Sequence, residues 1–357
     1  MKLSIRIPHT VIIASLALFL FPHFTRAAES FIIVDSQTGY ILGSKNPDDK
    51  RQIASLTKVA TALVVLDWAK LTTADLNELV SVPAAAAAVG GVNQTGLMAG
   101  DTISMRDLLY ASLMASDNIS AETLAHHVGR RLPNPNNLAP SLNFVSHMNG
   151  LAYELGMKRT KFTNPSGLDQ NPKNLPHSTA ADMARLTRYS YSQSAFAFYV
   201  AQTKREIHIF RDGQTASVWL TNTNSLLGQD DIDGVKTGRT SKAGDCIILS
   251  ADKSPETKQE GDNVLITPRR IIVVLLASPD RPAEGPDARR ASWPRRAARC
   301  RKNVPATTDR PWWQPVVWRV HHRTFQMRGR RRRCSRLGSP CGRVAGGCRR
   351  ASGRSCS

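Results

Sequence analysis

One predicted helix limits the folds open to this chain more than any other segment does. Residues 53–70 contain no Gly or Pro and are apolar on nearly every helical face. A helix that is apolar all round is stable only when it is buried on all sides. We therefore expect residues 53–70 to run through the centre of a folded domain, with the other elements packed around them.

Strand-forming segments lie at both ends of this domain. The apolar runs 31–34 and 40–42, joined by a Gly-containing turn, predict a β-hairpin. Residues 233–238, 246–251 and 270–278 predict three further strands. Helices are expected between the two sets of strands, at residues 104–115, 119–128, 141–156 and 179–190. This order predicts an α/β fold of the α+β type, in which one antiparallel sheet joins the two ends beside an inserted helical region.

The N-terminal segment has the order of features that is typical of a secretory signal. Lys2 and Arg6 precede an apolar run that is too short to span a bilayer, and small residues follow that run. We therefore interpret residues 1–28 as a signal peptide and expect the protein to be exported to the periplasm or the cell envelope.

The positive charge of the chain is concentrated in its C-terminal part. The formal net charge is +20, but residues 1–280 carry 27 Lys and Arg against 25 Asp and Glu, whereas residues 281–357 carry 21 against 3. A basic excess usually indicates nucleic acid or an anionic membrane as a partner. Because the excess is confined to the tail, no nucleic-acid partner is expected for the core.

Residues 282–357 do not have the pattern of a folded module, because prolines recur and the apolar residues show no period. Three explanations stay open: a basic arm around Arg330 to Arg333 that binds anionic polymers, simple disorder, or translation in a shifted frame shortly after residue 280. We favour the third, because a GC-rich gene read out of frame yields Arg, Gly, Cys and Trp. Five of the six cysteines lie in this tail. The remaining one, Cys246, is expected to be a buried apolar side chain without a chemical role.

Ser55 and Lys58 can form a pair of nucleophile and base. They lie three residues apart at the start of the predicted central helix, so they share a helical face. A buried lysine near another cation can lose its proton and then accept the proton of a serine hydroxyl. The helix N-terminus also supplies free N–H groups that can stabilise an oxyanion.

Two further motifs suit the same chemistry. Ser116-Asp117-Asn118 lies at the junction of two predicted helices, where Ser116 could also be a simple helix cap. Lys236-Thr237-Gly238 lies on a predicted strand, where the glycine allows a ligand to approach and the other two side chains offer a cation and a hydroxyl to an anionic group. Each motif alone is common, but the three in this order favour acyl transfer to a serine.

These motifs and the residues around them resemble a known family. The resemblance extends over residues 29–281 and includes Leu113 to Asn118, Phe162 to Leu168 and Gly234 to Gly238. The chain is similar to the serine D-Ala-D-Ala carboxypeptidases and endopeptidases, the low-molecular-mass penicillin-binding proteins of the S11 type. The resemblance implies a fold like that of β-lactamases and DD-peptidases, a peptidoglycan stem peptide ending in D-Ala-D-Ala as substrate, β-lactam antibiotics as acylating inhibitors, and no cofactor.

The resemblance also implies catalytic roles. Ser55 is implied to attack the carbonyl of the penultimate D-alanine, Lys58 to be the general base, and Ser116 to pass the proton to the departing D-alanine. The backbone N–H groups of Ser55 and of Arg239, which follows Gly238, are implied to form the oxyanion hole.

Four further residues are implied to contact the substrate or adjust the site. Asn118 is implied to hold the substrate amide, and Thr237 its carboxylate, while Lys236 adjusts the charge of the proton network. Arg270 is expected from strand register to make a second contact with the carboxylate.

Other functions stay open. An endopeptidase that cuts peptidoglycan cross-links breaks the same type of bond. A serine β-lactamase would share the three motifs. β-Lactamases with a similar motif set also have a glutamate in an E-x-x-L-N segment. None of Glu122, Glu154 and Glu206 is followed by that pattern. A non-enzymatic cell-wall or nucleic-acid binder would act through the tail.

No metal is expected, because H-E-x-x-H and paired C-x-x-C motifs are absent from the sequence. His126 and His127 are expected on a solvated helix face.

Overall fold

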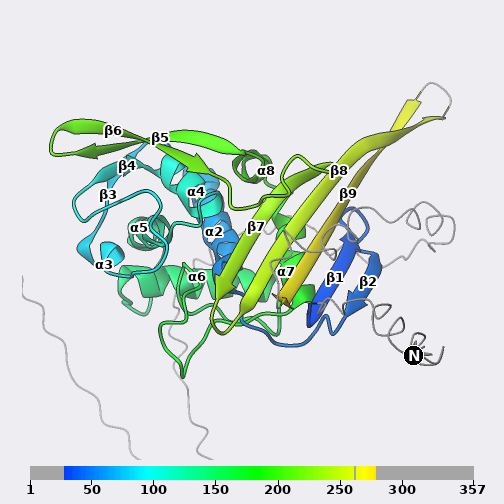
Figure 1. Cartoon of the computed structure of the whole chain (residues 1–357), viewed down its shortest axis with the longest axis horizontal. Helices are drawn as coiled ribbons and strands as arrows, with labels where there is room; N and C mark the ends of the chain where they lie inside the picture. The colour runs from blue at the N-terminus through cyan, green and yellow to red at the C-terminus, as the bar shows by residue number, and fades with distance from the viewer. Residues whose placement is uncertain (1–27, 261–262, 279–357) are drawn as a thin grey trace, which may run out of the picture. The chain divides into compact units, whose positions relative to one another are not determined.

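The predicted antiparallel sheet is present in the computed structural model, which describes residues 28–260 and 263–278 (Figure 1). Its strand order is β2-β1-β9-β8-β7. The strands are β1 (Ser30–Asp35), β2 (Ile41–Lys45), β7 (Ile232–Thr240), β8 (Gly244–Glu260) and β9 (Asn263–Ser278). Because β1 pairs with β9, the N-terminal hairpin and the last strands form one sheet, which confirms the expected α+β class. The signal peptide, apart from Ala28, and the basic tail lie outside the described residues.

The predicted central helix is α2 (Thr57–Thr72), and a 3-10 turn, η1 (Ala54–Leu56), leads into it. Every residue of α2 as far as Ala69 is buried, and the helix contacts helices from both halves of the chain. The prediction of a helix enclosed on all sides is therefore confirmed. Two ionisable side chains of α2, Lys58 and Asp67, are also buried. They need polar partners in the protein, because burying an ionisable group without such partners is costly.

The other predicted helices are present, with small differences at their ends. They are α4 (Met105–Leu113), α5 (Asn118–Gly129), α6 (Pro140–Glu154) and α7 (Ala180–Ser190), to which the structure adds α3 (Ala84–Ala87) and α8 (Ser194–Val200). The Asp117 side chain caps α5 by accepting a hydrogen bond from the N–H of Ser120. This cap determines where α5 begins and so fixes the conformation of the segment between α4 and α5. In the described part of the chain, no helix is long and apolar enough to cross a bilayer.

A second antiparallel sheet, which the sequence analysis does not predict, lies beside α4. Its order is β3-β4-β5-β6. The strands are β3 (Leu79–Ser81), β4 (Thr102–Ser104), β5 (Lys204–Arg211) and β6 (Gln214–Thr221). β5 and β6 form a hairpin, whereas β4 pairs with β5 across about a hundred residues of sequence, Thr102 facing Phe210. Two of the strands have three residues each, so they carry too little alternation to be read from the sequence.

The apolar core brings the start of α2 against the edge strand β7. Residues 271–276 of β9 are all buried, and alternate ones, such as Ile272 and Val274, share a core with α2. The turn η1 contacts β7 and β8 directly, and α8 also contacts β7. The three sequence motifs therefore lie where α2, the α4–α5 junction and β7 meet.

Candidate active site

Ser55 lies in η1, one turn before the body of α2. Its neighbour Ala54 has a φ of +46°, a left-handed conformation that L-residues adopt at a cost and that is common at functional sites. The side chain of Lys58 reaches back one helical turn, and its Nζ lies 2.9 Å from Ser55 Oγ. The expectation that the two residues touch is confirmed.

Lys58 is fully buried, and its amine is held by three oxygen atoms. Besides the Ser55 hydroxyl, Nζ donates to Asn118 Oδ1 at 2.8 Å and to the backbone carbonyl of Ser166 at 2.8 Å. The amide and carbonyl oxygens can only accept hydrogen bonds, so they occupy two N–H groups of the amine. The third direction of the nitrogen therefore points at Ser55 Oγ, with an N–H when the amine is charged and with the lone pair when it is neutral.

The surroundings of Lys58 favour the neutral amine. Burial lowers the pKa of Lys58 from 10.5 to about 7, although the carboxylates of Asp117 and Glu122 oppose this effect. Lys236, on β7, is also buried, and burial together with the charge of Lys58 holds the pKa of Lys236 well below its ordinary value. Two amines in one dry site cannot easily both be charged, so one of them is available as a base near neutral pH.

The second motif lies at the junction of α4 and α5. Ser116 has a φ of +61°, which turns the chain sharply before the Asp117 cap, and it lines the same cavity as Ser55. The Asn118 side chain points the other way, into the buried site, where its Nδ2 donates to the carbonyl of Gly90 at 3.2 Å. This bond fixes the amide so that Oδ1 faces Lys58.

The third motif lies on β7 directly against the nucleophile. A Cβ atom at Gly238 would lie 2.9 Å from the backbone nitrogen of Ser55, so only glycine lets the strand approach this closely. The Thr237 hydroxyl donates to Thr223 Oγ1 at 2.7 Å, and Lys236 Nζ donates to the Thr237 carbonyl at 2.8 Å. The Arg239 side chain is 63% exposed and lies 3.6 Å from an Asp245 carboxylate oxygen.

A cavity of about 380 Å³ opens above these groups. It is lined by Ser55, Val92, Gln94, Ala115, Ser116, Thr223, Ser225, Thr237, Gly238, Arg239, Asp245, Cys246 and Ile247. The nucleophile, the second serine and the Thr-Gly-Arg segment face this cavity, whereas Lys58, Asn118 and Lys236 lie beneath its floor. The arrangement offers a serine with an adjacent base and a pocket with cationic and hydroxyl groups.

The structure does not bring Arg270 to this cavity, so that expectation is wrong. Arg270 lies opposite Asp252, whereas Gly238 lies opposite Cys246, near the other end of β8. Its guanidinium is bound by Asp233 at 2.7 Å and by Asp252 at 2.7 Å, and it stacks on the Tyr191 ring at 3.9 Å. β8 separates β9 from β7 in the sheet, so Arg270 does not lie on the strand next to the motif.

Several residues of the site are not identified from the sequence. Ser166 acts through its backbone carbonyl, Thr223 supports the Thr237 hydroxyl, and Val92 and Gln94 form the rim of the cavity. The segment Phe162 to Leu168 is part of the family resemblance, and that resemblance is the one available signal for Ser166. Cys246 is buried as expected, and burial raises the pKa of its thiol to about 12.

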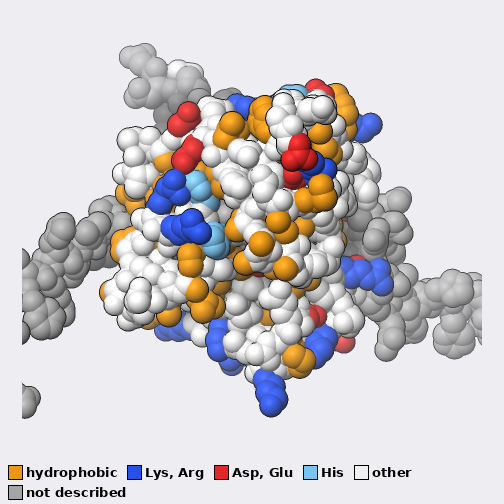
Figure 2. Space-filling view, turned by 90° about the vertical axis from the view of Figure 1, so that its left-hand side faces the viewer, with side chains coloured by type: hydrophobic (Ala, Val, Ile, Leu, Met, Phe, Trp, Pro, Cys, Tyr) orange, Lys and Arg blue, Asp and Glu red, His pale blue; other side chains and the backbone are white. Residues whose placement is uncertain are grey.

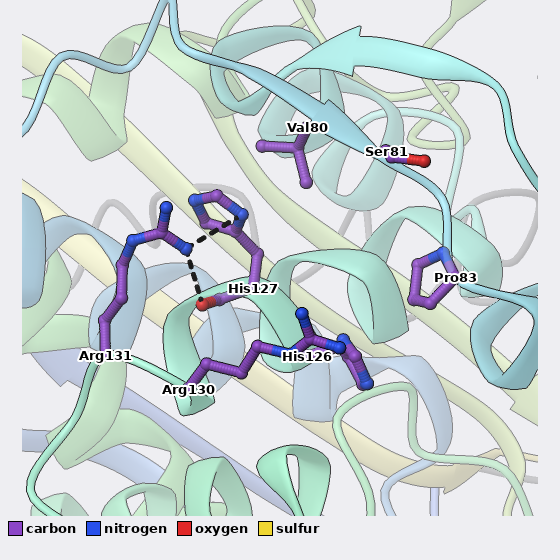
Figure 3. A pocket seen from close by; sticks show the side chains of 7 residues that line it. All are labelled: Val80, Ser81, Pro83, His126, His127, Arg130 and Arg131. Atoms are coloured by element: carbon purple, nitrogen blue, oxygen red, sulfur yellow. Dashed lines mark hydrogen bonds between the residues drawn. The ribbon is translucent and has the colours of Figure 1, made fainter.

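A second hollow, of about 260 Å³, lies apart from this site on the face that carries β3 and the end of α5 (Figures 2 and 3). Arg131 Nη1 lies 3.2 Å from the His127 ring nitrogen, and Arg131 also pairs with Glu78 at 3.0 Å. The His127 side chain is 11% exposed and packs edge-on against Trp68, so the expectation of a solvated face is wrong for His127. Within residues 28–260 and 263–278, no three His, Cys, Asp or Glu side chains cluster closely enough to hold a metal ion.

Comparison with known proteins gives matches over the whole site. A family model described as D-alanyl-D-alanine carboxypeptidase matches residues 21–258. The D-alanyl-D-alanine carboxypeptidase DacF of Bacillus subtilis is 29% identical over 227 residues, which is 63% of this chain and 54% of that protein. The D-alanyl-D-alanine endopeptidase of Escherichia coli is 34% identical over 233 residues, 62% of this chain and 66% of that protein. The match thus spans about half of the first relative.

Among solved structures, the Streptomyces K15 DD-transpeptidase has the same fold. The TM-score is 0.63 with 26% sequence identity, and the match covers 75% of this chain and 96% of the K15 protein. The expected fold, like that of β-lactamases and DD-peptidases, is confirmed.

Proposed function

Because this chain belongs to the D-alanyl-D-alanine carboxypeptidase family, we propose that it is an exported serine peptidase that removes the terminal D-alanine from peptidoglycan stem peptides. The substrate is a peptide ending in D-Ala-D-Ala, and the reaction has two steps. The serine first takes the acyl group, and water then releases it. β-Lactam antibiotics acylate the same serine.

In the first step, the neutral amine of Lys58 accepts the proton of the Ser55 hydroxyl while Oγ forms a bond to the carbonyl carbon of the penultimate D-alanine. The tetrahedral oxyanion receives hydrogen bonds from the backbone N–H groups of Ser55 and Arg239. The C–N bond then breaks, and the proton passes from Lys58 through the Ser116 hydroxyl to the departing amine. In the second step, water attacks the ester, gives its proton to the same base and restores Ser55.

The pocket has the charges that this substrate needs. The terminal carboxylate lies over β7, where Thr237 offers a hydroxyl, while the buried Lys236 amine adjusts the charge of the proton network. Asn118 Nδ2 donates one hydrogen bond to the Gly90 carbonyl, and its second N–H binds the carbonyl oxygen of the substrate amide on the acyl side. The exposed Arg239 side chain lies at the rim of the cavity.

One observation carries the proposal: two acceptor-only oxygens fix the Lys58 amine so that its remaining direction points at Ser55 Oγ, 2.9 Å away. This is the geometry of a nucleophile with its general base. The test is release of D-alanine from a synthetic pentapeptide ending in D-Ala-D-Ala, with the Ser55→Ala variant as control. D-Alanine release by the wild type alone supports the proposal, and equal release by the two proteins contradicts it.

An endopeptidase activity on cross-linked peptides is the second candidate, and the E. coli match carries that name. The bond is the same type, so the distinction lies in the leaving group. Parallel assays with a pentapeptide and a cross-linked dimer decide between them. A rapid β-lactamase is disfavoured, because the buried Glu122 is held by Ser141 and Ser166 and does not line the cavity.

A further inference from the structure

Glu122 is a buried acid to which the reaction described above gives no role. It lies on α5, one turn after the Asn118 motif, and is 7% exposed. One carboxylate oxygen accepts a hydrogen bond from the Ser166 hydroxyl at 3.1 Å, and the other accepts one from the Ser141 hydroxyl of α6 at 3.3 Å. Glu122 therefore ties together α5, α6 and the turn that contains Ser166.

That turn is the one that holds the amine of the catalytic base. The backbone carbonyl of Ser166 accepts a hydrogen bond from Lys58 Nζ at 2.8 Å. The hydroxyl of the same residue lies 3.1 Å from a Glu122 carboxylate oxygen and, at the longer distance of 3.3 Å, from Asn164 Oδ1. The neighbouring carbonyl of Pro165 is fixed in turn by the Thr61 hydroxyl of α2 at 2.7 Å. A single residue thus links the Glu122 carboxylate to the Lys58 amine, and its orientation depends on both.

Glu122 also belongs to the small set of charges that act on Lys58. These are Asp117 and Glu122 from α5 and Lys236 from β7. Asp117 is committed to capping α5, through Ser120, and to the Thr95 hydroxyl at 3.0 Å. Glu122 has no such capping duty. Burial raises the pKa of its carboxyl group, whereas the hydrogen bonds from Ser166 and Ser141 and the charge of Lys58 oppose that rise and favour the charged form. Its place in a dry site beside the Lys58 amine is best explained by an effect on that amine.

We propose that Glu122 is a positioning residue for the base: its carboxylate fixes the Ser166 carbonyl against Lys58 Nζ, and its negative charge acts on the buried amine of Lys58. This inference rests on the proposed function, because it assumes that Lys58 is the base for Ser55. The negative charge favours the protonated amine, so Glu122 sets the pH above which Ser55 can be activated.

Two substitutions separate the charge from the hydrogen bond. Glu122→Gln keeps an oxygen for Ser166 and an amide for Ser141 but removes the charge. Glu122→Asp keeps the charge but is too short to reach Ser166. Glu154→Gln, at an exposed position of α6, is the matched control. The measurement is the second-order rate of acylation by benzylpenicillin between pH 5 and 9, with thermal unfolding as a check that each variant is folded.

We expect the acid limb of the Glu122→Gln profile to move to lower pH by about half a unit or more, so that the rate at pH 5.5, relative to the plateau, rises about 3-fold. Glu122→Asp is expected to keep the wild-type limb and to lose several-fold in plateau rate, and Glu154→Gln to match the wild type. An acid limb in Glu122→Gln that stays in place or moves to higher pH overturns the inference.

If Glu122→Gln does not fold, Glu122→Asp still decides, because an unchanged plateau rate in that variant also overturns the inference. A wild-type protein that benzylpenicillin does not acylate at any pH would instead contradict the proposed function itself.

Discussion

Replacing Gly167 by alanine should separate the turn that holds the base from the turn that carries the nucleophile. Gly167 follows Ser166 and has a φ of +83°. A Cβ atom there would lie 1.9 Å from the Ala54 carbonyl oxygen and 2.8 Å from Thr57 Oγ1. Both contacts flank Ser55, and the first is with backbone, so the new methyl group can be accommodated only if one of the turns moves.

Gly156→Ala provides the matched control, because Gly156 has a φ of +69° but nothing within 4 Å of its added Cβ. The left-handed conformation alone costs about 1–2 kcal/mol in each variant. Overpacking at Gly167 adds about 1–3 kcal/mol, so Gly167→Ala should lose roughly 2–5 kcal/mol in all. Urea unfolding measures the free energy of unfolding, and stopped-flow acylation by benzylpenicillin measures the site.

We expect Gly156→Ala to acylate like the wild type and Gly167→Ala to acylate at least tenfold more slowly. Equal unfolding free energies and equal acylation rates in the two variants would refute the reasoning that the two turns are locked together.

Three other predictions follow from the same structure. Because the pKa of Lys58 is about 7, the acylation rate should rise with pH up to about 7 and then level off. The Lys58→Arg variant should lose about 10²-fold or more in acylation rate, because its side chain stays charged. A wild-type acylation rate in that variant would contradict the assignment of Lys58 as the base. Burial raises the pKa of Asp67 from 3.8 to about 6, so the folded protein binds more protons than the unfolded chain between these values and stability falls as pH rises through them. Asp67→Asn should remove that fall, on the order of 3 kcal/mol, in denaturation experiments at pH 4 and 7, and identical pH dependence in the two proteins would count against it. Because Asp233 holds Arg270 away from the cavity, Arg270→Leu should lower the free energy of unfolding by about 1–3 kcal/mol and leave the acylation rate within twofold. A large loss of acylation rate at an unchanged free energy of unfolding would instead show that Arg270 contributes to the site.

The elements predicted from the sequence are those with long, regular patterns. The central helix at 53–70 and the strand at 270–278 are long, nearly continuous apolar stretches, and the two apolar runs of the N-terminal hairpin are joined by a Gly-containing turn. The second sheet could not be predicted, because β3 and β4 are short and the pairing of Thr102 with Phe210 is set by tertiary packing.

The candidate site divides in a similar way. Ser55 and Lys58 act through side chains in a compact motif, so their spacing makes them candidates, and the two other motifs and the family resemblance imply their roles. Ser166 acts through its backbone carbonyl, which every residue type has, so the sequence does not identify it. The error at Arg270 is one of strand order and register. β8 separates β9 from β7, and Arg270 faces Asp252 instead of the β8 residues that face Lys236 to Gly238.

The most direct test of the account is the mass of the protein after reaction with benzylpenicillin, followed by peptide mapping of the adduct. We predict one penicilloyl group per molecule, located on Ser55, stable long enough to be isolated and absent from the Ser55→Ala variant. An adduct on another residue, or an equal adduct on Ser55→Ala, would contradict the claim that Ser55 and Lys58 form the catalytic pair.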